Sequence, residues 1–348
     1  MRTPSFLIIA LLVGGLVFAA ALAVGNDYVF FAGYVVLQYV VLSTAWNILG
    51  GYCGYVNFGT GAFFAIGAYS TVAVYKLIEN NELPHAVPIP VLMLIGGFVS
   101  GLIGLGMGYL TLRLRGAFFS IATLALAVVL ETLVVNWDFV GGSRGAYVLR
   151  PETIAYLGNY VRYLFLIMLL LAIASLVIAR LIERSRLGFG LATIRDDELA
   201  AEASGVPTLR LKLIATTLSG ALMGMAGAPF PYYIAYLQPD STFALDYAVN
   251  SIAMPLIGGT STWIGPLIGS VLLGSLQQII TVTISSAVNL LLVGVVLVAF
   301  VIVAPNGIVG LVHKYLQHKG DDFVGRRHAG LDAPEAAADA GATPEAPS

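Results

Sequence analysis

Charged residues are scarce in this 348-residue chain. Asp, Glu, Lys and Arg make up only 10% of it, whereas hydrophobic residues make up 58% and the mean hydropathy is +0.89. A soluble domain carries about 25% charged residues, so this chain lacks the polar surface that would cover a globule in water. The sequence therefore predicts a membrane protein.

A positive net charge and a set of cysteines are also absent. Lys and Arg number 17 against 19 Asp and Glu, a net charge of -2, so no basic field is available to bind nucleic acid. The single cysteine, Cys53, cannot form an internal disulfide or a zinc cluster. We therefore set aside nucleic-acid partners and disulfide-stabilised folds.

Catalytic constellations are missing as well. The four histidines, His85, His313, His318 and His328, all lie outside the apolar runs, so none forms a metal-binding pair within a span. The sequence contains neither a Gly-x-x-x-x-Gly-Lys-Ser/Thr phosphate loop nor a Gly-x-Ser-x-Gly nucleophile turn. We expect no metal site, no cofactor bound by this chain, no ATPase site and no enzymatic activity of its own.

Long apolar runs are what the sequence does contain. A transmembrane helix needs about 20 apolar residues, and the runs of this chain provide eight to ten passes, which predicts an all-α, polytopic helical bundle. Glu131 is the one serious candidate for an ionisable residue of a proton or ion pathway. It lies near the outer end of its span, where it can reach the interface. An ion-coupled carrier that acts alone is disfavoured for this reason, but it stays open. The uncharged runs are Phe6 to Val24, Val29 to Tyr75, Ile89 to Leu112, Gly116 to Leu130, Tyr163 to Ala179, Leu213 to Leu237 and Tyr247 to Val312.

The distribution of Lys and Arg predicts the orientation. Positive residues are retained on the cytoplasmic side, and they are concentrated in alternate connections, most of all in residues 184–212 and after residue 313. We therefore expect both termini and the loop 184–212 to be cytoplasmic. Residues 1–318 form the predicted transmembrane domain. Residues 319–348, rich in Ala, Pro, Gly and acidic side chains, form a predicted disordered cytoplasmic tail. Residues 1–25 are expected to be a retained span, with a cleaved signal peptide as the alternative.

Two Gly-rich segments, residues 50–61 and 258–266, interrupt the apolar runs. Non-helical backbone at membrane depth must be satisfied by protein or by water in a cavity, and interruptions at corresponding positions in two halves of a chain indicate a translocation path. We therefore predict an internal repeat and a path along these segments; close helix packing through small residues is the alternative. The candidate path residues are Asn47, Asn57, Phe58, Gly59, Gly61, Asn250, Gly258, Gly259, Gly265 and Pro266.

The loop 184–212 contains a predicted surface helix. Residues 191–203 are good helix formers, and Gly205 with Pro207 supplies a stop signal. On one continuous helix, Arg195, Glu198 and Glu202 would share a face. Such a helix is either a solvated connection or an element that a partner protein binds in a groove.

Taken together, these motifs resemble the permease subunits of branched-chain amino acid ABC importers, in particular their LivM-like members. The resemblance covers nearly the whole chain apart from the tail. It is carried in order by residues 51–69, by Leu112 to Phe119 with Thr123 to Ala125, by Asn136-Trp137 with Gly141-Gly142, by Ser185 to Gly205, and by Lys212, Gly224, Ala226-Gly227, Pro239 to Ser241 and the segment from Gly258 to Pro266.

The resemblance implies a bacterial inner-membrane importer with two permease subunits, two cytoplasmic ATPase subunits that bind the ATP, and a periplasmic solute-binding protein. This chain would be one permease, paired with a different permease chain. Departures from the family pattern at Val128, Asn250 and residues 260–262 leave the solute open: branched-chain amino acids, or urea and short-chain amides. The residues implied to couple the permease to its ATPase are Arg195, Asp196, Asp197, Glu198, Glu202 and Gly205.

Overall fold

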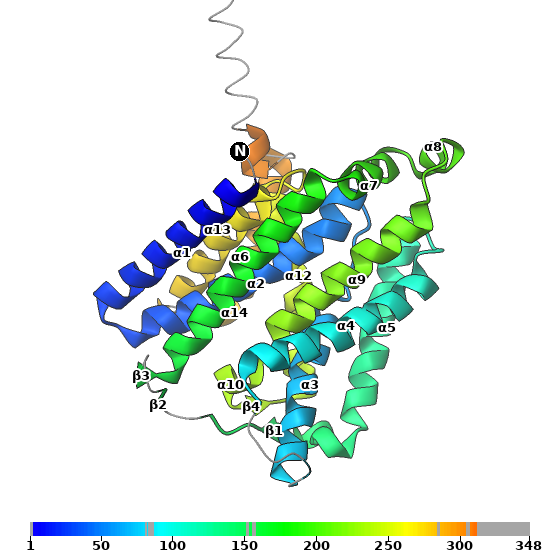
Figure 1. Ribbon diagram of the computed structural model, residues 1–348. Helices are drawn as coiled ribbons and strands as arrows, with labels where there is room; N and C mark the ends of the chain where they lie inside the picture. The colour runs from blue at the N-terminus through cyan, green and yellow to red at the C-terminus, as the bar shows by residue number, and fades with distance from the viewer. Residues whose placement is uncertain are drawn as a thin grey trace, which may run out of the picture.

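The computed structural model describes residues 3–80, 82, 87–150, 153–154, 158–283, 286–303 and 307–311. These residues form fourteen α-helices, two short 3-10 helices and four strands of two residues each (Figure 1). The expected all-α helical bundle is confirmed. The predicted tail, residues 319–348, lies outside the described residues.

The helices and strands follow one another along the chain in the order given below. The strands β1 (Ala146–Tyr147) and β4 (Tyr236–Leu237) pair antiparallel, as do β2 (Thr153–Ile154) and β3 (Gly158–Asn159). The α-helices are α1 (Thr3–Val24), α2 (Asp27–Cys53), α3 (Thr60–Glu79), α4 (Ile89–Thr111), α5 (Ala117–Val135), α6 (Tyr160–Glu183), α7 (Arg186–Asp196), α8 (Glu198–Ala203), α9 (Thr208–Gly227), α10 (Phe230–Ile234), α11 (Pro239–Thr242), α12 (Leu245–Gly258), α13 (Ile264–Thr283) and α14 (Ser286–Val303); the 3-10 helices are η1 (Asp138–Val140) and η2 (Gly142–Arg144).

Eight candidate membrane spans are present in the described part of the chain. They are α1 to α6, the stretch Thr208–Ile234 that comprises α9 and α10, and α13. Two further apolar helices pack in the same bundle: α12, with 14 residues, and α14, with 18. The count agrees with the expected eight to ten spans.

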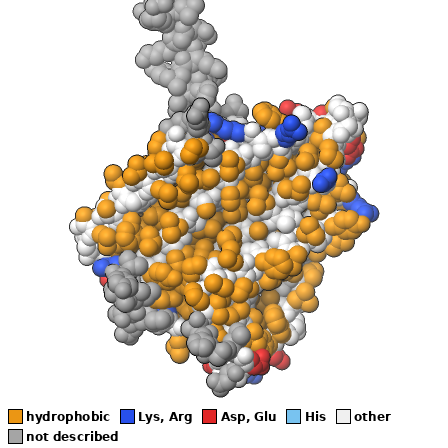
Figure 2. All heavy atoms as spheres, viewed as in Figure 1, with side chains coloured by type: hydrophobic (Ala, Val, Ile, Leu, Met, Phe, Trp, Pro, Cys, Tyr) orange, Lys and Arg blue, Asp and Glu red, His pale blue; other side chains and the backbone are white. Residues whose placement is uncertain are grey.

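The outer surface of the bundle is apolar between two charged ends. Large side chains such as Leu16 on α1, Phe98 on α4 and Phe118 on α5 are about 70% exposed. Figure 2 shows hydrophobic atoms over most of the visible face, with the Lys, Arg, Asp and Glu side chains gathered toward its edges. A band of this kind is stable only against lipid. The chain is therefore a multi-pass membrane protein.

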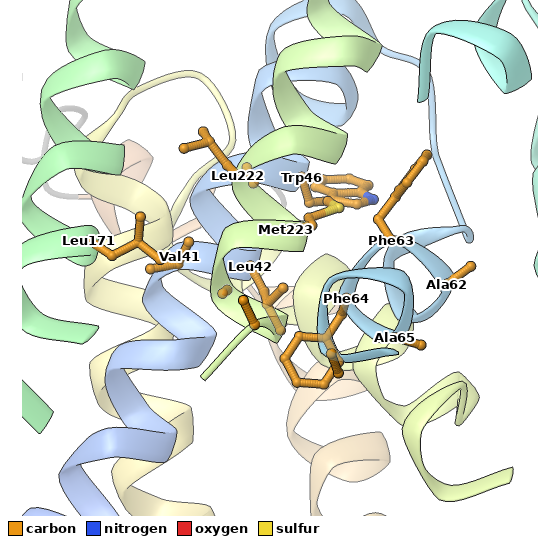
Figure 3. Packing of buried hydrophobic residues seen from close by; sticks show 14 of the residues in the cluster. Val41, Leu42, Trp46, Ala62, Phe63, Phe64, Ala65, Leu171, Leu222 and Met223 are labelled. Atoms are coloured by element: carbon orange, nitrogen blue, oxygen red, sulfur yellow. The ribbon is translucent and has the colours of Figure 1, made fainter. Parts of the chain in front are cut away.

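Close helix packing at the core depends on small residues. An added Cβ on Gly67 of α3 would overlap the backbone oxygen of Gly224 on α9, and the Ser100 hydroxyl of α4 donates to the backbone oxygen of Phe63 at 2.8 Å. Trp46 of α2, Phe63 of α3 and Met223 of α9 belong to one buried cluster, and Figure 3 shows their side chains in the space among these helices. These contacts pack α2, α3, α4 and α9 closely against one another.

The inner end of the bundle is the end that carries α7 and α8, between α6 and α9 (Figure 1). Phe6 of α1 contacts Trp263 at this end, and the backbone N–H of Trp263 donates to Glu183, the last residue of α6. At the outer end, Arg162 of α6 pairs with Asp27 of α2 at 2.9 Å.

Two helices, α3 and α12, begin in the middle of the bundle rather than at an end. Gly61 of α3 lies against the backbone oxygens of Phe243 and Ala244, just before α12. These residues line the same cavity as Leu124 and Ala127, which are halfway along α5. From this meeting point α3 runs outward and α12 runs inward.

The helix order repeats with opposite direction. The series α1, α2, α3, α4, α5 is followed by α6, α9, α12, α13, α14, and each helix of the second series runs opposite to its counterpart. Equivalent pairs are packed alike: α3 contacts α9 as α12 contacts α2, and α4 contacts α9 as α13 contacts α2. This arrangement is an inverted repeat of two five-helix halves.

The structure corrects the pairing of the two Gly-rich segments. Residues 54–59, which precede α3, correspond to residues 228–244, which precede α12. Within the second Gly-rich segment, residues 258–266, the connecting residues 259–263 instead join α12 to α13 and correspond to the connection between α3 and α4. The expectation failed because shared glycines alone do not distinguish an extended segment from a tight helix-to-helix turn.

Candidate functional site

Residues 54–59 form an extended segment that enters the bundle from the inner end. Gly54 ends α2 in a left-handed conformation, with φ 80° and ψ 8°, which glycine adopts without steric cost. The next five residues are not helical, although the N–H of Tyr55 still donates to the oxygen of Leu49 and the oxygen of Gly59 accepts from the N–H of Phe63 in α3. The other backbone groups of the segment therefore need partners from elsewhere.

Side chains from α2 and α5 supply those partners. Trp46 donates through Nε1 to the backbone oxygen of Asn57 at 2.9 Å. On α5, Ser120 donates to the backbone oxygen of Val56 at 2.8 Å, and Thr123 accepts from the backbone N–H of Phe58 at 3.1 Å. Asn57 itself accepts from the N–H of Gly59 at 2.7 Å. Side chains thus bond the backbone of each residue from Val56 to Gly59.

A cavity of about 310 Å³ opens where α3 and α12 begin. It is mainly apolar, with the carboxylates of Glu131 and Asp240 at its edge. Two helix N-termini meet here, and helix N-termini carry partial positive charge. The lining residues are Phe58, Gly61, Ala62, Leu124, Ala127, Val128, Glu131, Asp240, Phe243, Ala244, Leu245 and Ala248.

The candidate path residues of the first Gly-rich segment fall into three positions. Phe58 and Gly61 line the cavity. Asn57 and Gly59 shape the extended segment beside it. Asn47 is buried and lies against Gly51, away from the cavity lining. Phe58 and Gly61 therefore place the first segment at the cavity, whereas Asn47 lies outside its lining; their role in a translocation path stays a prediction.

Asn250, another predicted path residue, lies outside the lining of this cavity. Its amide donates to the Tyr39 hydroxyl at 3.3 Å and accepts from Gln277 at 2.8 Å. Ser43 and Ser270 extend this contact at 2.6 Å between α2 and α13. Asn250 therefore joins three helices through hydrogen bonds, which is the packing role of polar side chains in membrane bundles.

The remaining predicted path residues, Gly258, Gly259, Gly265 and Pro266, also lie outside the cavity lining. They form the turn between α12 and α13, in which backbone packs directly on backbone. An added Cβ on Gly258 would overlap the oxygen of Gly265, and one on Gly265 would overlap the oxygen of Gly259. Their role in the structure is close packing at the inner end.

The cavity residues that the sequence missed come from α5 and from the segment before α12. Leu124, Val128 and Phe243 are ordinary apolar residues, which carry no signal of a cavity. Asp240 was visible as a carboxylate beside a long apolar run, and its position next to Glu131 depends on the fold. The part of the chain that the structure describes contains no group of three metal-ligating side chains.

The predicted surface helix is two helices. Asp197, with φ -159°, interrupts it and accepts from the N–H groups of Leu199 and Ala200, so it caps α8. An Asp at such a position favours a helix start over a helix interior. The prediction that Arg195 and Glu198 share one helix face is therefore wrong. Arg195 donates to the backbone oxygen of Gly51 at 3.2 Å, whereas Glu198 points toward α9.

Glu198 lies in a charged cluster beneath α8. Lys212 of α9 donates to its Oε1 at 2.5 Å and to the Tyr55 hydroxyl at 3.1 Å, and Tyr55 donates to its Oε2. Burial by itself would raise the pKa of Glu198, but the hydrogen bonds from Lys212 and Tyr55, with the nearby positive charges, lower it below its ordinary value. Glu198 is thus held as a carboxylate.

The other expected coupling residues are more exposed. Glu202 pairs with Arg115 at 3.2 Å and accepts from the Thr208 hydroxyl at 2.8 Å. Asp196 lies 3.7 Å from Arg195. Gly205 ends the loop after α8 with φ 83°. The structure therefore brings most of the predicted loop residues to one charged surface at the inner end, next to the extended segment.

Comparison with known proteins decides the family. Residues 28–301 match the family described as branched-chain amino acid transport system / permease component. The chain belongs to this family. The match covers all the helices from α2 to α13 and most of α14, so the expected resemblance is confirmed.

Several relatives agree with this assignment. The chain is 27% identical to the high-affinity branched-chain amino acid transport system permease protein LivM of Salmonella typhimurium, over 83% of this chain and 72% of the relative. It is 24% identical to the probable LivH of Methanocaldococcus jannaschii, over 75% and 85%. It is also 24% identical to the ribose import permease protein RbsC of Haemophilus influenzae, over 64% and 68%. No solved structure matches the chain.

Family membership gives the chain its general role. It is a permease subunit of an ABC importer, a class of transporter that works with ATPase subunits and a solute-binding protein. The relatives include permeases named for branched-chain amino acids and permeases named for pentoses. The bundle described here therefore serves solute passage across a membrane.

Proposed function

We propose that this permease carries branched-chain amino acids inward across a bacterial inner membrane, driven by two cytoplasmic ATPase subunits that bind α7 and α8. It pairs with a second, different permease chain and receives its solute from a periplasmic binding protein. The termini and the loop 184–212 face the cytoplasm. ATP is bound by the partners, and this chain binds no cofactor.

The contact between the charged loop and the extended segment supports this proposal. Arg195 and Glu198 of the loop reach Gly51 and Tyr55 directly, and Phe58, three residues after Tyr55, lines the cavity. A partner that moves α7 and α8 would therefore act on the cavity wall. In that arrangement the chain itself needs no ATPase site.

The apolar cavity wall supports a cargo with an apolar side chain. Phe58, Leu124, Val128 and Phe243 present hydrocarbon to the interior, while Glu131 and Asp240 stand at the edge. Such a lining suits leucine, isoleucine or valine better than urea or a pentose, which offer little apolar surface to bury.

Reconstitution tests this function. The tagged chain is purified with its partners from its native membrane, the partners are identified by mass spectrometry, and the complex is placed in proteoliposomes with its binding protein. We expect ATP-dependent accumulation of radiolabelled leucine, and none with ADP. Preferred accumulation of urea or ribose would reassign the cargo, and accumulation by this chain alone without ATP would replace the proposal with an ion-coupled carrier.

A further inference from the structure

Lys212 is an unusual residue to find at this position. Its side chain is only 3% exposed, in the second turn of α9, and a buried ammonium is costly unless it is fully paired. Lys212 donates to Glu198 of α8 at 2.5 Å, to the Tyr55 hydroxyl at 3.1 Å, and to the backbone oxygen of Leu112 at 3.1 Å. One side chain thus joins α8, the extended segment and the end of α4.

We propose that Glu198, Lys212 and Tyr55 form a connector that passes movement of α8 to the extended segment 54–59, with Lys212 and Tyr55 as positioning residues. This inference rests on the proposed function, because it assumes that the partner ATPases move α8.

The connector consists of three side chains in direct contact with one another. Tyr55 donates to Oε2 of Glu198, Lys212 donates to Oε1, and the ammonium lies 4.6 Å from the centroid of the Tyr55 ring. Each of the three side chains therefore contacts the other two. Charge-assisted hydrogen bonds are stronger and more directional than neutral ones, so a displacement of Glu198 moves Tyr55 with it.

From Tyr55 the displacement has a defined course to the cavity. The Tyr55 ring packs edge-on against Phe119 of α5 at 5.1 Å. The next residues are bonded to α5 through Ser120 and Thr123, and Phe58 lines the cavity. Movement of the connector therefore shifts the extended segment and the inner half of α5 together, and these two elements form one wall of the cavity.

Stability alone does not account for this cluster. A well-packed apolar set of the same volume is often as stable as a buried ion pair, or more stable. The ion pair at the outer end, Asp27 with Arg162, is about half exposed on the Asp27 side and joins only α2 and α6. It provides a control for the loss of one charge, because it also joins a basic and an acidic side chain but contacts neither α8 nor the extended segment.

The test uses the whole importer complex in proteoliposomes. Tyr55→Phe removes one hydroxyl and leaves the ring; Lys212→Met and Glu198→Gln remove the charges; Arg162→Gln is the control. We expect Tyr55→Phe to keep the melting temperature of the control but to lower solute moved per ATP hydrolysed about tenfold, an ordinary size for a coupling between two sites. A mutation that only destabilised the fold would lower solute uptake and ATP hydrolysis together.

A second readout follows the extended segment itself. Val56 is exposed, so Val56→Cys on a Cys53→Ala background places a single thiol in that segment. In the otherwise unaltered complex, we expect its maleimide labelling rate to change when a non-hydrolysable ATP analogue is added. With Tyr55→Phe added, we expect the change to disappear.

Two outcomes separate this inference from the proposed function. If the unaltered complex couples ATP to uptake and Tyr55→Phe retains the full ratio and the full labelling change, the connector is refuted while the importer stands. If the unaltered complex does not couple ATP to uptake, both fall. Where Lys212→Met fails to assemble, Tyr55→Phe still decides, because it preserves the ion pair.

Discussion

The two Gly-rich segments look alike in sequence and differ in how they are held. Residues 54–59 are extended, and side chains from α2 and α5 bond their backbone. Residues 259–263 form a turn in which the backbones of α12 and α13 touch, with Gly258, Gly265 and Gly269 against opposing main-chain oxygens. Gly54, with φ 80°, thus serves conformation in the first segment, whereas in the second Gly259 has φ 119° and the glycines around it allow close approach.

The difference decides which substitutions each segment tolerates. The turn depends on the absence of side chains, so any added carbon disturbs it. The extended segment depends on the presence of particular side chains around it, so it is sensitive to the loss of a hydrogen-bond donor. The first segment borders the cavity and the second does not. Damage to the turn should act through stability, and damage to the extended segment through transport.

The largest effect is expected for Gly265→Ala. The new methyl would overlap the backbone oxygen of Gly259, and backbone cannot move aside as a flexible side chain can, so we expect a loss of about 3 kcal/mol in the free energy of unfolding. Thermal unfolding in detergent measures it. Gly106→Ala is the control, since nothing lies within 4 Å of the added carbon; equal stability of the two variants would contradict the backbone contact.

A smaller loss is expected for Trp46→Phe. The ring volume is largely retained, but the buried oxygen of Asn57 loses its donor, which costs about 1–3 kcal/mol. Because the extended segment borders the cavity, uptake should fall further than stability explains. The matched control is Trp137→Phe, whose side chain is 49% exposed at the outer end. If the loss of uptake is explained by the loss of melting temperature in both variants, the proposed difference between the two segments is contradicted.

Gly54→Ala should cost less again. An alanine at φ 80° is strained, which costs about 1–2 kcal/mol, and its Cβ would lie 3.0 Å from Cγ of Arg195. Gly205→Ala is a useful comparison because Gly205 has φ 83° with open space around it. We expect only Gly54→Ala to reduce transport coupling, since only Gly54 lies against α7. Reduced coupling in both variants would show that strain alone is responsible.

Composition and the length of the apolar runs were enough to predict the bundle, because lipid imposes one solution on a long uncharged run. The charged loop 184–212 was predicted from its Lys, Arg, Asp and Glu residues. The break at Asp197 was missed, because the capping preference of one aspartate competes with strong helix formers on both sides. The cavity could not be predicted from Leu124 or Phe243, since apolar residues that line a cavity and those that face lipid read the same.

Asn250 and Lys212 show the limit most clearly. Both are polar residues within or beside apolar helices, and the sequence favoured Asn250 as a path residue. In the structure, Asn250 joins helices, whereas Lys212 connects the loop to the extended segment. Which polar side chain meets which neighbour depends on helix rotation and on contacts between residues far apart in the chain, for example the 157 positions between Tyr55 and Lys212.

The smallest expected effect is a pH dependence that arises at Glu198 of α8, the partner of Tyr55 in the extended segment. The pKa of Glu198 is lowered in the folded protein, since the bonds from Lys212 and Tyr55 outweigh burial. A carboxylate of this kind adds stability above its unfolded pKa, about 4.3, and that contribution is lost as the pH falls through the lower, folded value. The melting-temperature difference between the unaltered chain and Glu198→Gln should thus stay constant from neutral pH to about pH 5 and shrink below about pH 4.

The same difference measured on a Gly265→Ala background should follow the same curve, because the turn and the connector are bonded to different side chains. A melting-temperature difference that grows on acidification would mean that Glu198 is not held as a carboxylate. Tyr55 would then have no charged partner on α8.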